Sequence, residues 1–468
     1  MSYMSLYPAF ARHGRLHLNP EGSRAYLAIP RGERPDGTEV NVGKWATSIV
    51  RRMDGEHSLL DLSRIALETR KAAAPGEPPD QTLQHFADLV NGLAERSIVD
   101  LADHPLARPV PTTGAPDRQS PTHASVELTD YCNLACKHCY RESSPACSNF
   151  APTEKLLGWL DELHQTGVAV VELTGGEPTS HPDFAAILRT CTAMFELTAV
   201  ISNGTLWTDE MIAVASEAGD AMFAQIDLDG ATAESHDYLR GKGVFDKATK
   251  TITRLSEAGV MCKVAMSVHG RNASEIVETA RLAKRLGARW FSFGPVLQMG
   301  RGHHTDPLLP RHGQLMLEAK DLLREEMRGF VYFGEKMELD ISKPDGNCGA
   351  GWRGVALGPD GRVRACVMHD PNHLDFGNLN DVGVHGVLER IPGERIRQIP
   401  SPNYEDCAGC QHIAFCGGCS ARAIQANEFH RAKDDGFTCA WNEKYHALDA
   451  YAPRLLDREP ASSLKHLV

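Results

Sequence analysis

The stretch Cys132-Asn133-Leu134-Ala135-Cys136-Lys137-His138-Cys139 decides how the rest of the chain is interpreted. It follows an apolar run, 124–128, that predicts a β-strand. Three clustered thiolates are one ligand short of a closed set. A [4Fe–4S] cluster held by three cysteines leaves one iron open, whereas structural zinc takes four protein donors. Because His138 could be the fourth zinc ligand, the spacing alone leaves both metals open.

The sequence around this motif has the repeating strand and helix pattern of a parallel sheet. Apolar runs alternate with amphipathic segments of helix length, at a spacing of roughly 30 residues. The six predicted strands are 124–128, 168–173, 197–202, 222–227, 261–268 and 290–293. Six such units predict an α/β fold with a partial (βα)6 barrel over residues 123–330. The cysteine motif would then lie at the carboxyl ends of the strands, where barrel loops build active sites.

Composition limits the class of protein. The 468 residues are too many for one compact core, and the net charge of −12 disfavours a broad surface for nucleic acid or anionic membrane. No run of eighteen apolar residues and no signal peptide is evident, so we expect a cytoplasmic protein. The thirteen cysteines are odd in number and clustered, which favours metal binding over a disulfide framework.

Residues 1–103 predict a small α+β domain with extended runs at 24–29 and 38–42. Three helical stripes follow: Trp45, Ile49, Val50 and Met53, then Leu62, Ile65 and Ala66, then Leu83, Phe86, Val90 and Leu93. Ser58 suits the N-cap of the second helix. Residues 104–122 are rich in proline and predict an extended linker without helix or sheet. Residues 331–468 lose the barrel rhythm and predict a domain held together by inorganic centres.

The motif Cys132-x3-Cys136-x2-Cys139, with His138 before its last cysteine, resembles the signature of radical S-adenosylmethionine (SAM) enzymes. Gly175-Gly176-Glu177-Pro178 is similar to the GGEP element of that family, although read alone it predicts only a turn. The resemblance implies that the cysteines hold a [4Fe–4S] cluster and that His138 lies near the adenine. Gly175 and Gly176 would let the backbone approach SAM, and Glu177 would accept from its ammonium group.

Two further strand ends fall where the radical SAM family contacts ribose and carboxylate groups. Ser202 and Asn203 follow the third predicted strand, and Asp227 ends the fourth. Arg240 is the natural partner of the methionine carboxylate, because a guanidinium binds carboxylates bidentately. Each residue could instead serve a turn or a surface charge. Asp227 stands where the family commonly has serine, and an aspartate would repel the methionine carboxylate.

The C-terminal cysteines resemble the SPASM extension, which carries two auxiliary iron–sulfur clusters. The resemblance implies an outer cluster on Cys407, Cys410, Cys416 and Cys439, and an inner one on Cys348, Cys366 and Cys419. The spacing from Cys416 to Cys419 is one residue shorter than the usual pattern. The inner set is one ligand short, so either a distant donor completes it or one iron is open to a substrate thiolate. A zinc ribbon remains an alternative on spacing alone.

The N-terminal domain resembles the PqqD-like fold that recognises peptides in ribosomal-peptide maturation. A leader peptide would add a strand at the edge near 39–42, the alternative being a stabilising or dimerising module. These resemblances imply a radical SAM/SPASM enzyme whose 5′-deoxyadenosyl radical abstracts hydrogen from a precursor peptide and installs a thioether or carbon–carbon cross-link. A flavodoxin- or ferredoxin-type protein would be the reductant. The alternatives are tetrapyrrole side-chain chemistry, as in radical SAM haem biosynthesis, and a non-catalytic metal-binding or electron-transfer protein.

Overall fold

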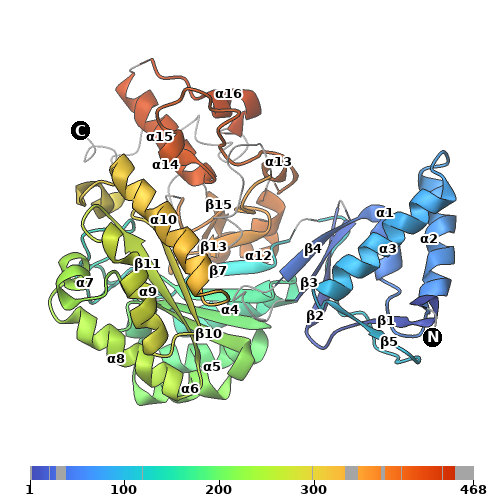
Figure 1. Ribbon diagram of the computed structural model, residues 1–468, viewed down its shortest axis with the longest axis horizontal. Coiled ribbons are helices and arrows are strands. Elements are labelled where there is room, and N and C mark those ends of the chain that lie inside the picture. Colours follow the sequence, from blue (N-terminus) through green and yellow to red (C-terminus); the bar gives the residue numbers. More distant parts are fainter. Residues whose placement is uncertain are drawn as a thin grey trace. The chain divides into compact units, whose positions relative to one another are not determined.

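The computed structural model describes residues 3–20, 22–27, 38–118, 120–297, 299–331, 346–369, 375–391, 393–434 and 436–447. The chain divides into two compact units, which are described separately (Figure 1). The first unit comprises Met1–Thr122 and His164–Ala169, and the second comprises His123–Leu163 and Val170–Val468. Within the described ranges, no helix combines the length and apolar character that a membrane crossing needs.

The first unit contains a four-stranded sheet with the order β4-β3-β2-β6. Its strands are β2 (Gly14–Asn19), β3 (Gly22–Leu27), β4 (Thr38–Gly43) and β6 (Thr112–Gly114), and a separate ribbon joins β1 (Tyr7–Phe10) to β5 (Val99–Ala102). Residues 28 and 29 of one predicted strand lie outside the described residues. Strand β6 pairs parallel with β2, so the expectation of a linker without sheet is wrong at 112–114. Among the described strands, β4 and β6 form the two edges of this sheet.

Three helices, α1 (Lys44–Val50), α2 (Leu59–Ala73) and α3 (Pro79–Glu95), complete this unit. Helix α2 begins at the predicted N-cap: the Ser58 hydroxyl accepts from the Asp61 backbone N–H at 3.2 Å, and the Asp61 carboxylate accepts from the Ser58 backbone N–H at 3.1 Å. The predicted stripes meet in one core. Leu83 is 37% exposed, contrary to prediction, because Thr82 occupies the buried position four residues before Phe86.

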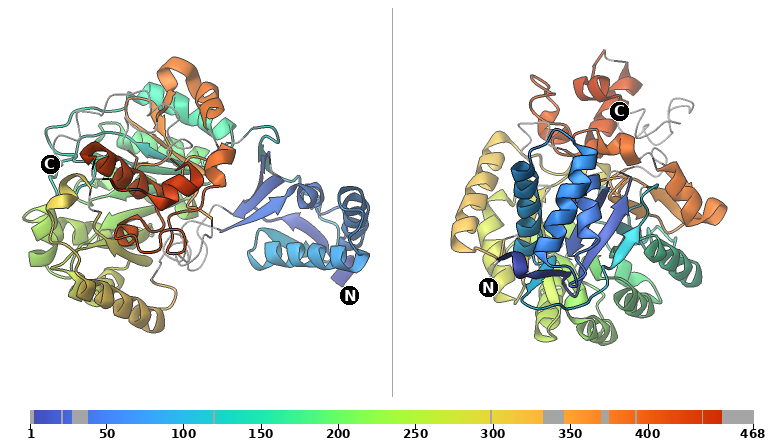
Figure 2. Two further views of the ribbon diagram at one scale, coloured as in Figure 1. Left: turned by 90° about the horizontal axis from the view of Figure 1, so that it is seen from above. Right: turned by 90° about the vertical axis from the view of Figure 1, so that its right-hand side faces the viewer.

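The second unit contains six parallel strands in chain order, as predicted. They are β7 (His123–Glu127), β8 (Val170–Thr174), β9 (Leu197–Ser202), β10 (Met222–Asp227), β11 (Met261–Val268) and β12 (Trp290–Pro295). Helices lie on the outer side of this curved sheet (Figures 1 and 2). They are α4 (Thr153–Gln165), α5 (Phe184–Met194), α6 (Asp209–Glu217), α7 (Ala233–Arg240), α8 (Val244–Glu257), α9 (Ile276–Arg285) and α10 (Pro310–Glu326). This arrangement confirms the partial (βα)6 barrel.

Three C-terminal strands extend the barrel sheet beyond β7. Strand β13 (Gly354–Leu357) pairs parallel with β7, and β14 (Arg362–Arg364) and β15 (Asp375–Asn378) follow antiparallel. The sequence did not predict them, because three or four residues are too few to show an alternating pattern. The remaining helices are α12 (Leu379–Arg390), α13 (Gly393–Arg397), α14 (Ile413–Cys416), α15 (Ser420–Lys433) and α16 (Ala440–Tyr445).

A buried carboxylate joins the barrel to these strands. Glu127 ends β7, and its Oε1 accepts a hydrogen bond from Arg364 Nη2 at 2.6 Å. Its Oε2 accepts from Arg141 Nη2 at 3.0 Å. Glu127 and Arg364 are both only 1% exposed. Because Arg141 follows the cysteine motif and Arg364 ends β14, this network connects the first barrel strand, the cysteine motif and the C-terminal sheet.

We expect Arg364→Leu to lower the free energy of unfolding by about 3 kcal/mol, because Glu127 loses a buried charge partner. Urea denaturation measures the loss, and hydrogen exchange should locate it in β13 and β14. Arg362→Leu on the same strand is the control. Its partner Asp360 is 3.6 Å away and half exposed, so the change should stay within about 1 kcal/mol. Equal stability of the two variants would contradict this role of the network.

Candidate active site

The cysteine loop, defined here as residues 128–144, follows β7 and carries the three predicted thiols. Cys132 and Cys136 are buried. The Cys132 sulfur accepts from the Leu134 backbone N–H at 3.4 Å and from Asn203 Nδ2 at 3.8 Å. Arg301 Nε donates to the Cys136 carbonyl at 2.8 Å, and Arg301 Nη2 donates to the Ser143 carbonyl at 2.6 Å. The loop is therefore held mainly through its backbone, which leaves the sulfur atoms to bind a metal.

The electrostatics of these thiols fit an iron–sulfur cluster. Burial raises the pKa of Cys132 to about 12 and that of Cys136 to about 11, and the neighbouring thiols and carboxylates add to the increase. Buried thiols of this kind do not ionise without a cation to compensate the charge. Iron supplies that compensation, because a coordinating thiol binds as the thiolate. The buried sulfurs of this loop therefore need a bound cation to act as thiolates.

Gly175 and Gly176 lie in the turn after β8, packed against the backbone of the cysteine loop. A Cβ on Gly175 would lie 2.4 Å from the Thr129 carbonyl oxygen, and one on Gly176 would lie 2.1 Å from the Tyr131 carbonyl oxygen. The Gly176 N–H donates to the Thr129 carbonyl at 2.7 Å. Glycine is therefore required here because two loops of the chain pass close to each other.

Glu177 has no side-chain exposure, and its carboxylate is fully engaged within the chain. Oε1 accepts from the Thr179 backbone N–H at 3.1 Å, from the Thr179 hydroxyl at 2.5 Å and from the Ser202 hydroxyl at 2.8 Å. Oε2 accepts from the Asn203 backbone N–H at 2.8 Å. The carboxylate thus joins the turn after β8 to the turn after β9, and its expected contact with the SAM ammonium stays a prediction.

Ser202 and Asn203 serve the same junction. The Ser202 hydroxyl also accepts from the Gly204 backbone N–H at 3.0 Å and from Trp207 Nε1 at 3.1 Å. Asn203 Nδ2 donates to the Asn133 side chain at 3.0 Å, inside the cysteine loop. The structure therefore brings the predicted residues after β8 and β9 together beside Cys132. In this state both side chains hold loops in place.

Arg240, at the end of α7, binds two carboxylates of its own chain. Its Nε donates to Asp229 Oδ2 at 2.5 Å, and its Nη2 lies 3.1 Å from Asp227 Oδ2. The same Nη2 is 3.4 Å from His138 Nε2. The structure thus brings together the predicted residues His138, Asp227 and Arg240, and it adds Asp229, which is completely buried.

The pKa values of the two aspartates shift in opposite directions. Burial raises the pKa of Asp227 more than Arg240 lowers it. Burial also acts to raise the pKa of Asp229, but Arg240 together with His138 and His236 holds it well below its usual range. Asp229 is therefore the carboxylate that more readily keeps its negative charge beside Arg240.

Sequence reasoning missed the residues that fix Asp229. Asp229 Oδ1 accepts from the Ser267 backbone N–H at 2.8 Å, and the Asp229 N–H donates to His236 Nδ1 at 2.9 Å. Asn272 Nδ2 donates to the Asp229 carbonyl at 2.8 Å. The repeat Asp227-x-Asp229 was visible at a strand end, but nothing in the sequence indicated which aspartate Arg240 would contact more closely.

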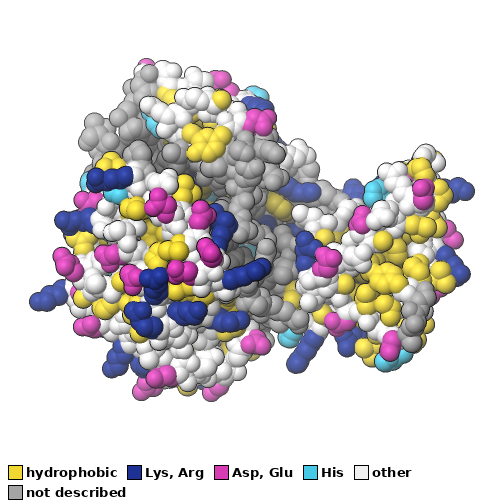
Figure 3. All heavy atoms as spheres, viewed as in Figure 1, with side chains coloured by type: hydrophobic (Ala, Val, Ile, Leu, Met, Phe, Trp, Pro, Cys, Tyr) yellow, Lys and Arg dark blue, Asp and Glu magenta, His cyan; other side chains and the backbone are white. Residues whose placement is uncertain are grey.

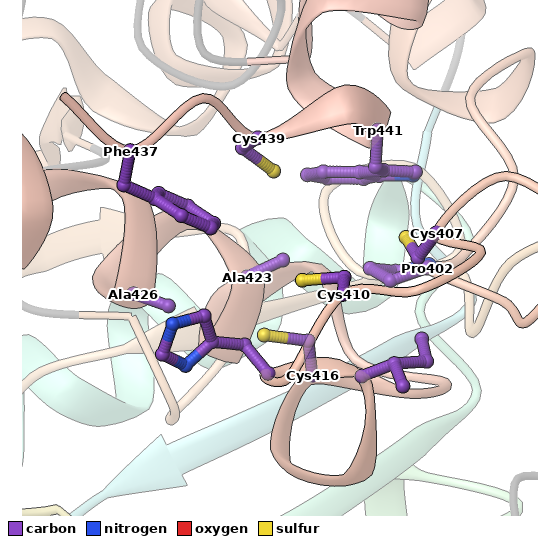
Figure 4. A pocket seen from close by; sticks show the side chains of 11 residues that line it. Pro402, Cys407, Cys410, Cys416, Ala423, Ala426, Phe437, Cys439 and Trp441 are labelled. Carbon is purple, nitrogen blue, oxygen red and sulfur yellow. The ribbon is translucent and has the colours of Figure 1, made fainter.

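Four C-terminal thiols surround a separate small cavity, shown in Figure 4. They belong to Cys407, Cys410, Cys416 and Cys439, which are the four predicted ligands of the outer cluster. Apolar side chains complete the lining, including Pro402, Phe437 and Trp441. Burial raises the pKa of Cys407, Cys416 and Cys439, that of Cys416 to about 12. Four thiols around a volume suit a cluster, whose ligands bind different iron atoms.

The predicted inner ligands Cys348, Cys366 and Cys419 do not line this cavity. Cys366 follows β14 by two residues, and its sulfur accepts from the Met368 backbone N–H at 3.2 Å. Tyr140 is close enough to both Cys139 and Cys366 for each to influence its phenol, whose pKa is raised chiefly by burial. Cys366 therefore lies on the side of the C-terminal region that faces the cysteine loop.

Known protein families match the regions of the chain that carry these two centres. The Radical SAM superfamily matches residues 126–283, and the SPASM iron-sulfur cluster-binding domain matches residues 348–411. The antilisterial bacteriocin subtilosin biosynthesis protein AlbA of Bacillus subtilis is 30% identical over 93% of this chain and 96% of its own length. AdoMet-dependent heme synthase of Methanosarcina barkeri is 29% identical over 66% of this chain and 93% of its own length.

Among solved structures, SuiB of Streptococcus suis bound to S-adenosylmethionine has a TM-score of 0.63 at 15% identity, covering 89% of this chain and 96% of that chain. SuiB is also known with its precursor peptide SuiA. This likeness establishes the fold, and the AlbA match extends through both units. Iron–sulfur binding at both centres removes the zinc alternatives, and an enzyme family removes the non-catalytic one. The chain therefore belongs to the radical SAM superfamily, as an enzyme with a C-terminal SPASM domain that uses iron–sulfur clusters and S-adenosylmethionine as cofactors.

Proposed function

We propose that this enzyme matures a ribosomally made precursor peptide. The [4Fe–4S] cluster and SAM supply a 5′-deoxyadenosyl radical by reductive cleavage of SAM, and that radical abstracts hydrogen from the peptide. The product carries a thioether or a carbon–carbon cross-link. The single observation that carries the proposal is the match to AlbA, a bacteriocin biosynthesis protein, over 93% of the chain. A cytoplasmic location belongs to the proposal, because the free thiols need a reducing compartment.

In this proposal, some residues at the carboxyl ends of the barrel strands contact the cluster or SAM, and others hold the loops that carry them. Cys132, Cys136 and Cys139 hold the cluster, and the ring of His138 contacts the adenine of SAM. The backbone at Gly175 and Gly176 accepts from the SAM ammonium. Arg240 contacts the SAM carboxylate through a hydrogen that its two aspartates leave free, since a guanidinium carries five N–H donors. Glu177, Ser202, Asn203 and Asp229 act by holding the loops in register.

The C-terminal centres accept the electron that the substrate radical must lose when the new bond forms. Cys407, Cys410, Cys416 and Cys439 hold the outer cluster in the cavity of Figure 4. Cys348, Cys366 and Cys419 hold the inner cluster, and an open iron there would bind a substrate thiolate. The influence of Cys366 on Tyr140, which follows Cys139, supports an inner cluster beside the barrel mouth.

The first unit recognises the leader part of the peptide as a PqqD-like domain would. Strand β4 supports this role, because it is an edge strand that pairs only with β3 among the described strands. The other edge strand, β6, has only three residues, Thr112–Gly114, and offers less backbone for pairing. A leader peptide would therefore extend the sheet by pairing with β4.

A second candidate function is tetrapyrrole side-chain modification. The match to the heme synthase, which covers 93% of that protein, favours it. That match covers only 66% of this chain, whereas the AlbA match covers 93%. Binding of a peptide by the full chain distinguishes the two functions.

Anaerobically reconstituted enzyme with SAM and dithionite should release 5′-deoxyadenosine, and Cys136→Ala should reduce the yield at least about 100-fold, because the cluster loses a ligand. Liquid chromatography measures the product. Cys262→Ala is the matched control, since Cys262 is buried within β11. Equal yields from both variants would contradict the assignment of the cysteine loop.

Glu177→Gln should weaken SAM binding about 10-fold, because the amide nitrogen faces donors where the carboxylate accepted four hydrogen bonds. Equilibrium dialysis of the reconstituted protein with labelled SAM measures the effect. Glu217→Gln, an exposed site paired with Arg189, should bind SAM as the parent does. An unchanged affinity in Glu177→Gln would show that the loops keep their register without this carboxylate.

Hydrogen exchange of the full chain tests the recognition role. A short peptide encoded beside this gene should slow exchange at the backbone amides of β4 severalfold, because strand addition supplies hydrogen bonds to its outer edge. The amides of β2 and β6 are the internal control and should not change. Protection confined to other segments would reject β4 as the docking strand, and no peptide binding would favour the tetrapyrrole function.

A further inference from the structure

The interior of the barrel has an apolar floor. Phe223 on β10 and Trp290 on β12 contact each other edge to face, with ring centroids 6.2 Å apart, although β11 lies between their strands. Such a contact is possible on the concave side of a curved sheet. All members of the surrounding cluster lie on strands: Val170, Leu197, Ala199, Phe223, Met261 and Trp290. The cluster therefore marks the inner face of the barrel strands, whose outer face is covered by helices.

A polar layer lies next to this floor, toward the carboxyl ends of the strands. Because successive side chains of a strand point to opposite faces, the residue two positions after a floor residue also points inward. On three strands this residue is polar: Glu172 on β8, Gln225 on β10 and Lys263 on β11. All three are half-buried. We name these three residues the interior polar layer.

Glu172 lies within reach of the end of the barrel that carries the cysteine loop. Its strand ends two residues later, at Thr174, and Thr174 pairs with Glu127, the residue that precedes the cysteine loop. At about 3.3 Å per residue, Glu172 is about 7 Å below the end of its strand. A peptide side chain that enters the barrel from this end would therefore reach the layer that contains Glu172.

The Glu172 carboxylate is largely uncommitted. In the part of the chain that the structure describes, it accepts one hydrogen bond, from the Ser125 hydroxyl at 3.4 Å, and pairs with no cation. Four other acids at or just after the strand ends are engaged by arginine or by several hydrogen-bond donors: Glu127, Glu177, Asp227 and Asp229. A carboxylate can take up a proton only through an oxygen that a substrate can approach. Glu172 meets this condition.

The interior polar layer does not favour a charged ligand. Charged side chains of both signs are spread over the outer surface in Figure 3, where they face water. Inside the barrel, the formal charge of Glu172 is balanced by that of Lys263 in the same layer. Attraction of a peptide cation would need an excess of negative charge there. Proton transfer needs only an accessible carboxylate.

We propose that Glu172 is the proton acceptor in cross-link formation. The 5′-deoxyadenosyl radical takes one hydrogen atom from the peptide and leaves a carbon radical. The second peptide group, a thiol or an aromatic C–H, gives its proton to the Glu172 carboxylate as its sulfur or carbon bonds to that radical carbon. The electron left over passes to an auxiliary iron–sulfur cluster, so atoms and electrons balance. This inference rests on the proposed function and adds where the proton goes.

Glu172→Gln tests this role, because it keeps the size of the side chain but cannot take up the proton. Reconstituted holoenzyme is given SAM, dithionite and the short peptide encoded beside this gene. The rate of 5′-deoxyadenosine formation should stay within about 2-fold of the parent, since hydrogen abstraction comes first. The ratio of cross-linked peptide to 5′-deoxyadenosine should fall at least about 10-fold. Mass spectrometry measures both products, and Glu172→Asp, which keeps a carboxylate, should recover part of the ratio.

Glu210→Gln is the matched control, because it makes the same change at an exposed position on α6 and should keep the parent ratio. Isothermal titration with the peptide, without dithionite, should give the parent Kd in Glu172→Gln. The role is rejected if Glu172→Gln keeps the parent ratio or if Glu210→Gln lowers the ratio as much. It is also rejected if Glu172→Gln loses peptide affinity, because Glu172 would then bind the peptide. A parent that forms no cross-link would instead reject the proposed function.

Discussion

Burial of sulfur without a compensating charge is the constraint on which this protein depends. The thiols of Cys132 and Cys136 are buried beside carboxylates and other thiols, which raises their pKa values to about 12 and about 11, so a cation is needed to stabilise their thiolates. When a cluster binds, the positive charge of its iron compensates the cost of burying the thiolates. The same physics recurs at the C-terminal cavity, where burial raises the pKa of Cys416 to about 12. At both centres a bound cluster would therefore stabilise buried thiolates that the surrounding protein alone does not stabilise.

The loops around the first centre are held by carboxylates that do not reach the surface. Glu177 joins the turns after β8 and β9, and Asp229 fixes Arg240 between α7 and β11. Glu177 accepts four hydrogen bonds and Asp229 contacts Arg240, and these contacts compensate part of the cost of burying each carboxylate. Preorganisation of this kind keeps a cofactor site in one geometry before the ligand binds.

The C-terminal region belongs to the same sheet as the barrel. Strand β13 pairs with β7, and the Glu127–Arg364 contact links β7 to β14. Cys366 comes two residues after β14, and the four outer thiols surround their own cavity. Because the barrel sheet continues into the C-terminal strands, the two kinds of centre share one support. AlbA matches this chain over nearly its whole length, which is consistent with one architecture for both proteins.

The sequence by itself determined the six barrel strands and the cysteine spacing, because periodicity and spacing are local properties of the chain. It did not reveal β6 or β13, since short strands exist only through the neighbour they pair with. It also did not show which groups of the protein the Glu177 carboxylate contacts. Whether that group faces a ligand or the protein depends on Thr179, Ser202 and Asn203, up to 26 residues away, and only the tertiary structure brings them together.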